Sequence, residues 1–232
     1  GELTVTETYF LRNLDQFNAY CEVALPDRLA ASAEWQTVRV LSAGCASGEE
    51  PYSLALMTHE HYAHALHRIV INAFDLNSAM LAKAARARYT NWSLRDFPAE
   101  LKARWFKSDA DCFVLDETIR KLVNFEQRNL AHEAPDLWQS ASLDIVFCRN
   151  VLMYFSPEQA QAVIKRIAYA LVPGGYLFLG HAETLRGLSD DFHLCHTHGT
   201  FYYQRKDELS APQHIAPEFV ARWRPAAALG DT

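Results

Sequence analysis

The fold of this chain is decided by residues 38–53, which read Val38-Arg39-Val40-Leu41-Ser42-Ala43-Gly44-Cys45-Ala46-Ser47-Gly48-Glu49-Glu50-Pro51-Tyr52-Ser53. The pattern predicts a buried strand, a turn of small residues and an acidic helix start. Small side chains leave the backbone of such a turn bare, so a nucleotide-like cofactor can lie against it. Glu49 and Glu50 would repel a pyrophosphate at the helix start, where phosphate normally binds free amides. The stretch therefore favours a cationic cofactor without phosphate, and S-adenosylmethionine fits that description.

The composition is that of an ordinary globular protein. Half of the 232 residues are hydrophobic and 22% are charged, which suits one large domain or one domain with a small insertion. The net charge of −6 disfavours sequence-independent nucleic-acid binding, and no apolar run approaches the ~18–20 residues of a membrane span. The five cysteines are scattered without a CxxC pair, which is typical of a reduced cytosolic chain. We expect a cytoplasmic protein that binds no nucleic acid and does not insert into the membrane.

Strand and helix patterns alternate along the chain. Apolar runs predict strands at about 38–44, 68–75, 121–129, 143–148, 176–180 and 199–205. Helical patterns lie at about 49–66 and 77–88. A further helix starts at a capping box over Ser156–Gln159 and ends at Pro173-Gly174-Gly175. The alternation predicts the α/β class, with an open, mostly parallel sheet covered on both faces.

The flanks set the expected domain boundaries. Residues 1–36 are expected to form an N-terminal segment. It should be helical over residues 4–33, with a break near Pro26. Residues 37–206 would form the α/β domain. Residues 207–232 lose periodicity and carry three prolines, so we expect a tail or linker there.

Polar and charged residues follow several of the predicted strands directly, where cofactors bind in such sheets. Asp75 ends the second strand and either accepts ribose hydroxyls or caps the next helix. Asn129 ends the third. Arg149 and Asn150 follow the fourth, where a guanidinium can orient a carboxylate through two hydrogen bonds or form a structural ion pair.

Several motifs in series resemble one known family, the CheR methyltransferases of chemoreceptor glutamates. The matching segments are Thr6-Glu7-Thr8-Tyr9-Phe10-Leu11-Arg12, Ala43-Gly44-Cys45-Ala46-Ser47-Gly48-Glu49-Glu50-Pro51-Tyr52-Ser53, Ala73-Phe74-Asp75-Leu76, Asn129-Leu130, Phe147-Cys148-Arg149-Asn150-Val151-Leu152-Met153-Tyr154-Phe155 and Gly180-His181-Ala182-Glu183. They run in family order over about residues 4–206. The resemblance implies a Rossmann-like fold that binds S-adenosylmethionine and releases S-adenosylhomocysteine.

The resemblance also implies which residues hold the cofactor. Glu49 would meet its cationic methionyl end, and Asp75 would meet its ribose. Asn129 and Leu130 would flank the adenine. The full implied set is Thr6, Thr8, Arg12, Ala43, Gly44, Cys45, Glu49, Asp75, Asn129, Leu130, Arg149 and Asn150.

The same resemblance places Arg149, Asn150 and Tyr154 at the methyl-transfer site as catalytic residues. The acceptor would be a glutamate carboxylate, which is ionised at neutral pH because its reference pKa is about 4.3. Such an acceptor needs no general base, and the motifs contain none. Tyr154 either hydrogen-bonds substrate or cofactor, or packs on the following helix.

The implied partner is the cytoplasmic region of a methyl-accepting chemoreceptor, and we expect the chain to act as a monomer. Two other functions stay open: a non-catalytic module that binds the cofactor, and a methyltransferase that acts on another carboxylate. A nicotinamide-dependent oxidoreductase is disfavoured because the GxGxxG spacing is missing and two acids stand where phosphate should bind.

Residues at about 91–118 interrupt the strand–helix alternation. Short alternating segments near 104–107 and 112–116 predict a small antiparallel insert with a turn at Asp109-Ala110-Asp111. Family members that tether to a receptor's C-terminal peptide have a glycine-containing loop in this insert. Residues 107–120 contain no glycine, so we expect a member that does not depend on that tether.

Histidines cluster within residues 59–67 and 193–198, but no acid or cysteine completes an obvious tetrahedral set. We therefore expect surface histidines and no metal. Cys148 lies in an apolar strand without a histidine placed to activate it, so we expect a buried thiol rather than a nucleophile.

Overall fold

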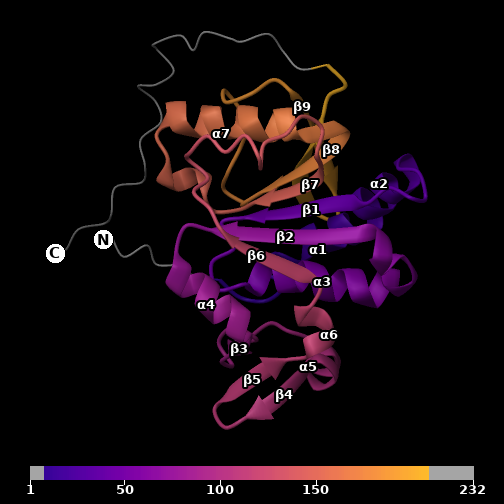
Figure 1. The fold of residues 1–232 in the computed structure, drawn as a ribbon, viewed down its shortest axis with the longest axis vertical. Coiled ribbons are helices and arrows are strands. Elements are labelled where there is room, and N and C mark those ends of the chain that lie inside the picture. Colours follow the sequence, from indigo (N-terminus) through magenta and orange to yellow (C-terminus); the bar gives the residue numbers. More distant parts are fainter. Residues whose placement is uncertain (1–7, 209–232) are drawn as a thin grey trace, which may run out of the picture.

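The computed structural model describes residues 8–208, and a seven-stranded sheet runs through their centre (Figure 1). Its order is β6-β2-β1-β7-β8-β10-β9. The strands are β1 (Val38–Ala43), β2 (Ile69–Asp75), β6 (Val123–Gln127), β7 (Leu143–Cys148), β8 (Leu171–Leu179), β9 (Phe192–Thr197) and β10 (Thr200–Arg205). The first five in sheet order are parallel, whereas β10 is antiparallel to both neighbours. The predicted α/β fold with a mostly parallel sheet is confirmed.

Helices cover both faces of the sheet. The helix α7 (Pro157–Ala170) lies on one face, and α1 (Leu14–Ala19) and α3 (Glu49–Tyr62) lie on the other (Figure 1). Alternate residues of a strand serve alternate faces: Phe147 of β7 joins the core on the α1 side, and its neighbour Val146 joins the core on the α7 side. Each face therefore has its own apolar core, and the sheet is buried between them.

The N-terminal helix differs from its prediction. Among the described residues it begins at Leu14, continues through a π-helical turn at Tyr20–Ala24 and ends with α2 (Leu25–Ala31). Pro26 lies at the second position of α2 and does not break the helix. The ring of a proline clashes with an ordinary preceding turn, and the wider π turn removes that clash.

The C-terminal third contains two further differences. The predicted capping box of α7 is present, but the helix ends at Ala170 and Pro173-Gly174-Gly175 lies inside β8. The β7–β8 pairing shifts its register there, which accommodates a proline in a central strand. The strand β9 was not predicted. It forms a hairpin with β10 through His198 and Gly199, which both have positive φ angles, as a two-residue hairpin turn requires.

The predicted antiparallel insert is present as a small sheet at one end of the molecule (Figure 1). Its order is β3-β5-β4, and the predicted turn connects β4 to β5. The short helix α5 was not predicted. The elements of this region are β3 (Arg88–Tyr89), α5 (Ala99–Trp105), β4 (Phe106–Asp109), β5 (Cys112–Leu115) and α6 (Glu117–Arg120). Phe10 packs edge-on against Tyr89, Phe97 and Phe106, so the N-terminal segment is anchored in the insert.

The order of the strands determines where a ligand can bind. β1 lies between β2 and β7, and the chain leaves β1 and β7 for helices on opposite faces. A crevice therefore opens beyond the carboxyl ends of these strands, which is where ligands bind in open α/β sheets. The remaining helical elements are η2 (Ala63–Arg68), α4 (Ser78–Arg86) and η3 (Leu152–Tyr154).

Candidate active site

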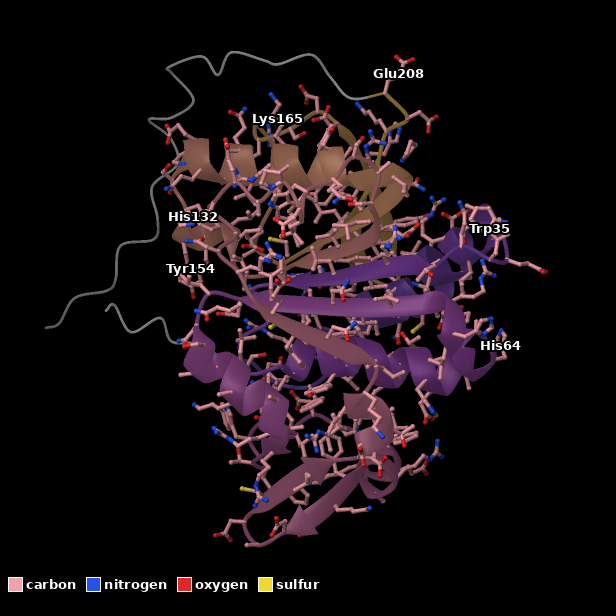
Figure 2. The ribbon with its side chains drawn as sticks, in the orientation of Figure 1. Trp35, His64, His132, Tyr154, Lys165 and Glu208 are labelled. Carbon is pink, nitrogen blue, oxygen red and sulfur yellow. The ribbon has the colours of Figure 1, made fainter. Side chains whose placement is uncertain are left out.

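A cavity of about 640 Å³ lies at the carboxyl ends of β1, β2, β6 and β7. Tyr154 marks this edge of the sheet in Figure 2, and Trp35 and His64 mark the opposite edge. Most of the predicted site residues line the cavity, namely Thr8, Arg12, Gly44, Cys45, Asp75, Asn129, Leu130, Arg149, Asn150 and Tyr154. Of the others, Thr6 lies outside the described residues, and Ala43 is buried in the core on the α7 side.

The turn after β1 is held against β2 by its backbone. The amides of Gly44 and Cys45 both donate to the carbonyl of Phe74, at 2.9 and 3.0 Å. Gly44 has a φ of +81°, and a Cβ there would lie 2.6 Å from Val151 Cγ2. Only glycine fits this position without strain, because both its backbone angle and the contact exclude a side chain.

Asp75 faces the cavity from the end of β2. Its Oδ2 accepts the amide of Ala46 at 2.8 Å, and its Oδ1 accepts the amide of Asn77 at 2.8 Å. The helix-cap interpretation of Asp75 is wrong, because Asn77 caps α4 by accepting the amides of Ala79 and Met80. A carboxylate has about four lone-pair sites, so Asp75 keeps acceptor capacity for ligand hydroxyls.

The structure corrects the assignment of the cavity acid. Glu49 is 3% exposed and does not line the cavity, since its carboxylate accepts hydrogen bonds from Ser47 and Ser93. Glu50 lines the cavity instead. Consecutive residues of an α-helix point about 100° apart, so only one of the two acids can face the crevice.

Glu50 forms an ion pair with Arg149. Its Oε2 accepts from Arg149 Nη1 at 3.2 Å, and its Oε1 accepts from Ser42 Oγ at 2.7 Å. Burial raises the pKa of Glu50, and the nearby guanidinium opposes that rise. Arg149 favours the ionised form of Glu50, and that carboxylate stands at the cavity wall, where it can meet a ligand cation.

Arg149 is also tied to the N-terminal segment. Its Nη2 donates to the carbonyl of Arg12 and to Asn13 Oδ1, both at 2.6 Å, and the side chain is almost completely buried. Burial lowers the pKa of Arg149, although Glu50 opposes the shift. The structure therefore shows the ion-pair interpretation directly, with the same arginine lining the cavity.

The segment after β7 forms the outer wall of the cavity. Asn150 has a φ of +57°, and its amide donates to Glu183. Tyr154 lines the cavity and is 57% exposed, so its ring is not buried in the core. Glu183 belongs to a segment that carried the family resemblance, but no sequence pattern predicted its three backbone hydrogen bonds.

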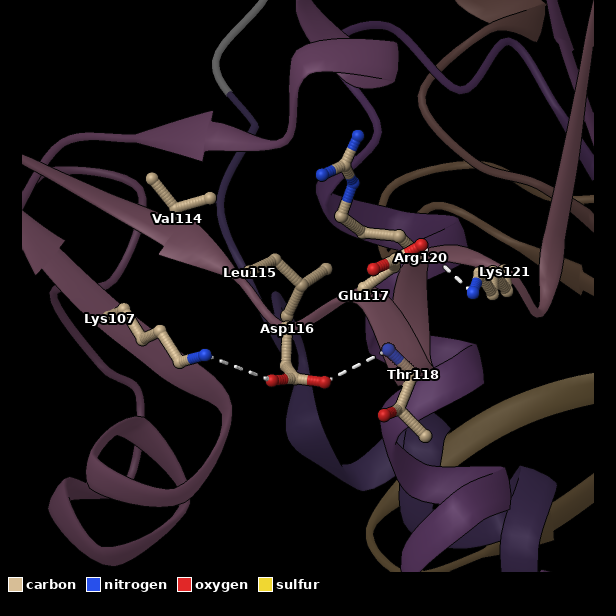
Figure 3. A pocket seen from close by; sticks show the side chains of 8 residues that line it. All are labelled: Lys107, Val114, Leu115, Asp116, Glu117, Thr118, Arg120 and Lys121. Carbon is tan, nitrogen blue, oxygen red and sulfur yellow. Dashed lines mark hydrogen bonds and ion pairs between the residues drawn. The ribbon is translucent and has the colours of Figure 1, made fainter.

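A second pocket, of about 570 Å³, lies between the insert and α6 (Figure 3). Four of its charged side chains form two pairs: Lys107 lies 3.9 Å from Asp116, and Lys121 lies 2.8 Å from Glu117. The fifth, Arg120, donates to the carbonyl of Ala85 at 3.0 Å. Asp116 also caps α6 by accepting the amide of Thr118. These groups already have partners, so the pocket carries no evident chemistry.

Within residues 8–208, no group of three or more His, Cys, Asp or Glu side chains is placed to hold a metal ion. Over the same range, no helix combines the length and the hydrophobicity needed to cross a membrane. Cys148 is fully buried and its burial raises the pKa of the thiol, which opposes a nucleophilic role.

The cavity fits S-adenosylmethionine. Its volume lies within the ~300–1,000 Å³ of small-molecule sites. Gly44 leaves backbone exposed beside β2, Asp75 offers a carboxylate to hydroxyls, and Glu50 offers one to a cation. These groups are the ones that a nucleoside carrying a positive charge requires.

Comparison with known proteins agrees with this fit. The family described as "CheR methyltransferase, SAM binding domain" matches residues 6–201. The chain is 35% identical to "Chemotaxis protein methyltransferase 2" of Vibrio cholerae serotype O1, over 83% of this chain and 67% of the relative. It is 33% identical to "Chemotaxis protein methyltransferase 1" of Pseudomonas aeruginosa, over 88% of this chain and 75% of the relative.

Solved structures resemble the chain more distantly. The DszA carbon methyltransferase matches with a TM-score of 0.49 and 18% identity, over 77% of this chain and 40% of that one. Magnesium protoporphyrin IX methyltransferase from Synechocystis PCC 6803, with bound SAM, matches with a TM-score of 0.42 and 15% identity, over 83% and 78%. The family match confirms the predicted cofactor and enzyme class. This chain belongs to the CheR methyltransferase family and is an S-adenosylmethionine-dependent methyltransferase.

Proposed function

We propose that this enzyme methylates glutamate side chains in the cytoplasmic region of a methyl-accepting chemoreceptor. The products would be glutamyl methyl esters and S-adenosylhomocysteine. The names of its relatives support a role in chemotaxis. We further propose that the enzyme acts in the cytoplasm as a monomer, without nucleic acid, membrane insertion or a receptor tether.

One observation carries the choice of a carboxylate as acceptor: among the described residues that line the cavity, none is a free general base. None of the described lining residues is histidine or lysine. Glu50 is paired with Arg149, and both oxygens of Asp75 accept backbone amides. An alcohol or amine acceptor needs a base to remove its proton, whereas a glutamate with a reference pKa of about 4.3 is already ionised.

The cofactor, when bound, supplies an activated methyl group on a sulfonium, and transfer of that group to a carboxylate oxygen leaves a neutral thioether without moving a proton. The task of the protein is alignment and exclusion of water. Such positioning of two reactants can lower a barrier by ~7–11 kcal/mol. We assign Glu50 and Asp75 to the cofactor, together with Thr8 and Arg12 from the N-terminal segment.

We assign the wall formed by Arg149, Asn150 and Tyr154 to the methyl-transfer side, and Asn129 and Leu130 to the adenine side. Arg149 would not bind the acceptor carboxylate through two parallel hydrogen bonds, as an unpaired guanidinium can. Its Nη atoms already bind Glu50, Arg12 and Asn13, so it would shape the wall and supply positive charge near the acceptor. Exposed Tyr154 would meet the incoming side chain directly.

The test incubates the enzyme with S-adenosylmethionine and cytoplasmic fragments of candidate chemoreceptors. Mass spectrometry should locate added methyl groups on glutamates, as esters that alkali removes. Asp75→Asn is the matched control, because it keeps the shape of the side chain but should weaken S-adenosylhomocysteine binding in calorimetry. Cofactor binding without methylation of any fragment would contradict the proposal and favour a non-catalytic module.

A further inference from the structure

Glu183 lies behind the cavity wall and does not line the cavity. It follows β8, and its amide closes a turn by donating to the carbonyl of Gly180 at 2.8 Å. Its carboxylate accepts three backbone amides. Oε2 accepts those of Gly180 at 2.7 Å and Asn150 at 2.8 Å, and Oε1 accepts that of Leu152 at 2.9 Å. One side chain thus joins the ends of two neighbouring strands.

The amides of Asn150 and Leu152 belong to the segment that forms the cavity wall. Asn150 has a left-handed backbone, with a φ of +57°. Such a conformation is strained for a residue other than glycine and persists only where its surroundings hold it. The two hydrogen bonds to Glu183 flank Val151 and supply that support.

The same segment touches the turn after β1. Val151 lies so close to Gly44 that a Cβ on the glycine would be 2.6 Å from Val151 Cγ2. The position of Val151 therefore affects both the wall and the cofactor turn. Gly180 leaves no spare room behind this arrangement, since a Cβ there would lie 2.7 Å from Glu183 Oε2 and 2.8 Å from the Asn150 amide nitrogen.

We propose that Glu183 is a positioning residue for methyl transfer. Through the amides of Asn150 and Leu152, it fixes the wall that presents Arg149 and Tyr154 to the cavity. This role rests on the proposed function and adds a residue that touches neither cofactor nor acceptor.

The first test replaces Glu183 by glutamine in the full chain. Glutamine has one acceptor oxygen, and its NH₂ group would face at least one backbone N–H, so the set of three bonds cannot persist. Hydrogen exchange followed by NMR should show the amides of Asn150 and Leu152 exchanging at least about tenfold faster, with β7 amides unchanged. Unchanged exchange at both amides would overturn the proposal.

The second readout is turnover per cofactor-binding site, counted by titration with S-adenosylhomocysteine. In E183Q this turnover should fall at least about tenfold, while the dissociation constant for S-adenosylhomocysteine changes less than about threefold. A merely structural role would reduce the number of sites and leave each at wild-type turnover, and that result would overturn the proposal. Glu133→Gln, at an exposed position, is the control.

Gly180→Ala provides an independent variant in case E183Q does not fold. It keeps the carboxylate but places a methyl group within 2.8 Å of the same two partners, so both readouts should change in the same direction. If the wild type binds S-adenosylhomocysteine but methylates no receptor fragment, the proposed function fails. Amide exchange then decides the positioning role by itself: faster exchange at Asn150 and Leu152 supports it, and unchanged exchange overturns it.

Discussion

Glu49 and Glu50 are adjacent in the chain and lie in different environments. Glu49 is buried among neutral partners, with hydrogen bonds from Ser47 at 2.7 Å and Ser93 at 3.0 Å. Glu50 faces the cavity and pairs with Arg149. Removing the charge should therefore stabilise the fold at Glu49 and weaken cofactor binding at Glu50.

Glu49→Gln should stabilise the protein at neutral and alkaline pH. Burial raises the pKa of Glu49 above its usual 4.5. A raised folded-state pKa stabilises the fold below the unfolded pKa, and this contribution is lost as the pH rises through the folded value. The glutamine variant has no ionisable carboxyl group at this position, so it does not lose this stability as the pH rises. The glutamine amide can still hydrogen-bond both serines. Its melting temperature should exceed that of the wild type at about pH 8, with a gap that narrows toward pH 4.5; a gap that widens on acidification would contradict this.

Glu50→Gln should weaken the site itself. Hydrogen bonds to charged groups contribute ~1.5–3 kcal/mol, so the affinity for S-adenosylhomocysteine should fall by about ten- to a hundredfold. Isothermal titration calorimetry measures this, with Glu49→Gln as the matched control at near wild-type affinity. Equal losses in the two variants would show that the cavity does not distinguish the acids.

The sequence predicted the cavity better than it predicted individual contacts. Gly44, Asp75 and Arg149 follow strands directly, so the parallel topology alone brings them to one edge. The choice between Glu49 and Glu50 depends on the rotation of α3 about its axis. That rotation is set by packing against the sheet, which the acids themselves do not reveal.

At the level of elements, local sequence signals predicted the ends of helices correctly where no strand pairing competed with them. The helix α7 begins where Ser156 and Gln159 form a capping box. The glycine pair after Pro173 marked a helix end, but the residues on either side of this segment pair with β7, so the segment lies within β8. Tertiary pairing overrides a local turn signal here.

Ser156→Ala tests the cap of α7. Ser156 Oγ accepts the amide of Gln159 at 3.3 Å, and the Gln159 side chain accepts the amide of Ser156 at 3.1 Å. Loss of such a cap costs ~1 kcal/mol, which should lower the melting temperature by ~2–4 °C for a chain of this size. Ser156→Thr keeps the hydroxyl and should recover most of the loss. Equal melting temperatures for alanine and threonine would show that the cap contributes nothing.

At the level of the whole molecule, the buried sheet separates two apolar cores. Phe147 stacks on Phe178 with the ring centroids 4.4 Å apart, and both rings face the layer of N-terminal helices. Ile164 and Leu177 belong to the core under α7. Unfolding of either layer would expose the central strands, so we expect both layers to open together.

The cysteines report on this cooperativity. Cys112 and Cys195 are partly exposed, whereas Cys21, Cys45 and Cys148 are buried. Burial raises the pKa of Cys21 to about 12 and raises those of Cys45 and Cys148 as well, and thiols react as thiolates. A thiol reagent at neutral pH should label the two partly exposed cysteines first.

The three buried thiols then separate local from global opening. Cys21 lies in the π-helical turn of the N-terminal helix, and Cys148 is the last residue of β7, the middle strand of the sheet. Both are buried, so both should react at one slow rate that denaturant accelerates equally. Cys45 lines the cavity, and S-adenosylhomocysteine should slow its labelling more than theirs, because local opening of the turn exposes it. Mass spectrometry of labelled peptides measures all three rates. If Cys21 reacts much faster than Cys148, the helical layer opens by itself, and the sheet does not unite the molecule into one cooperative unit.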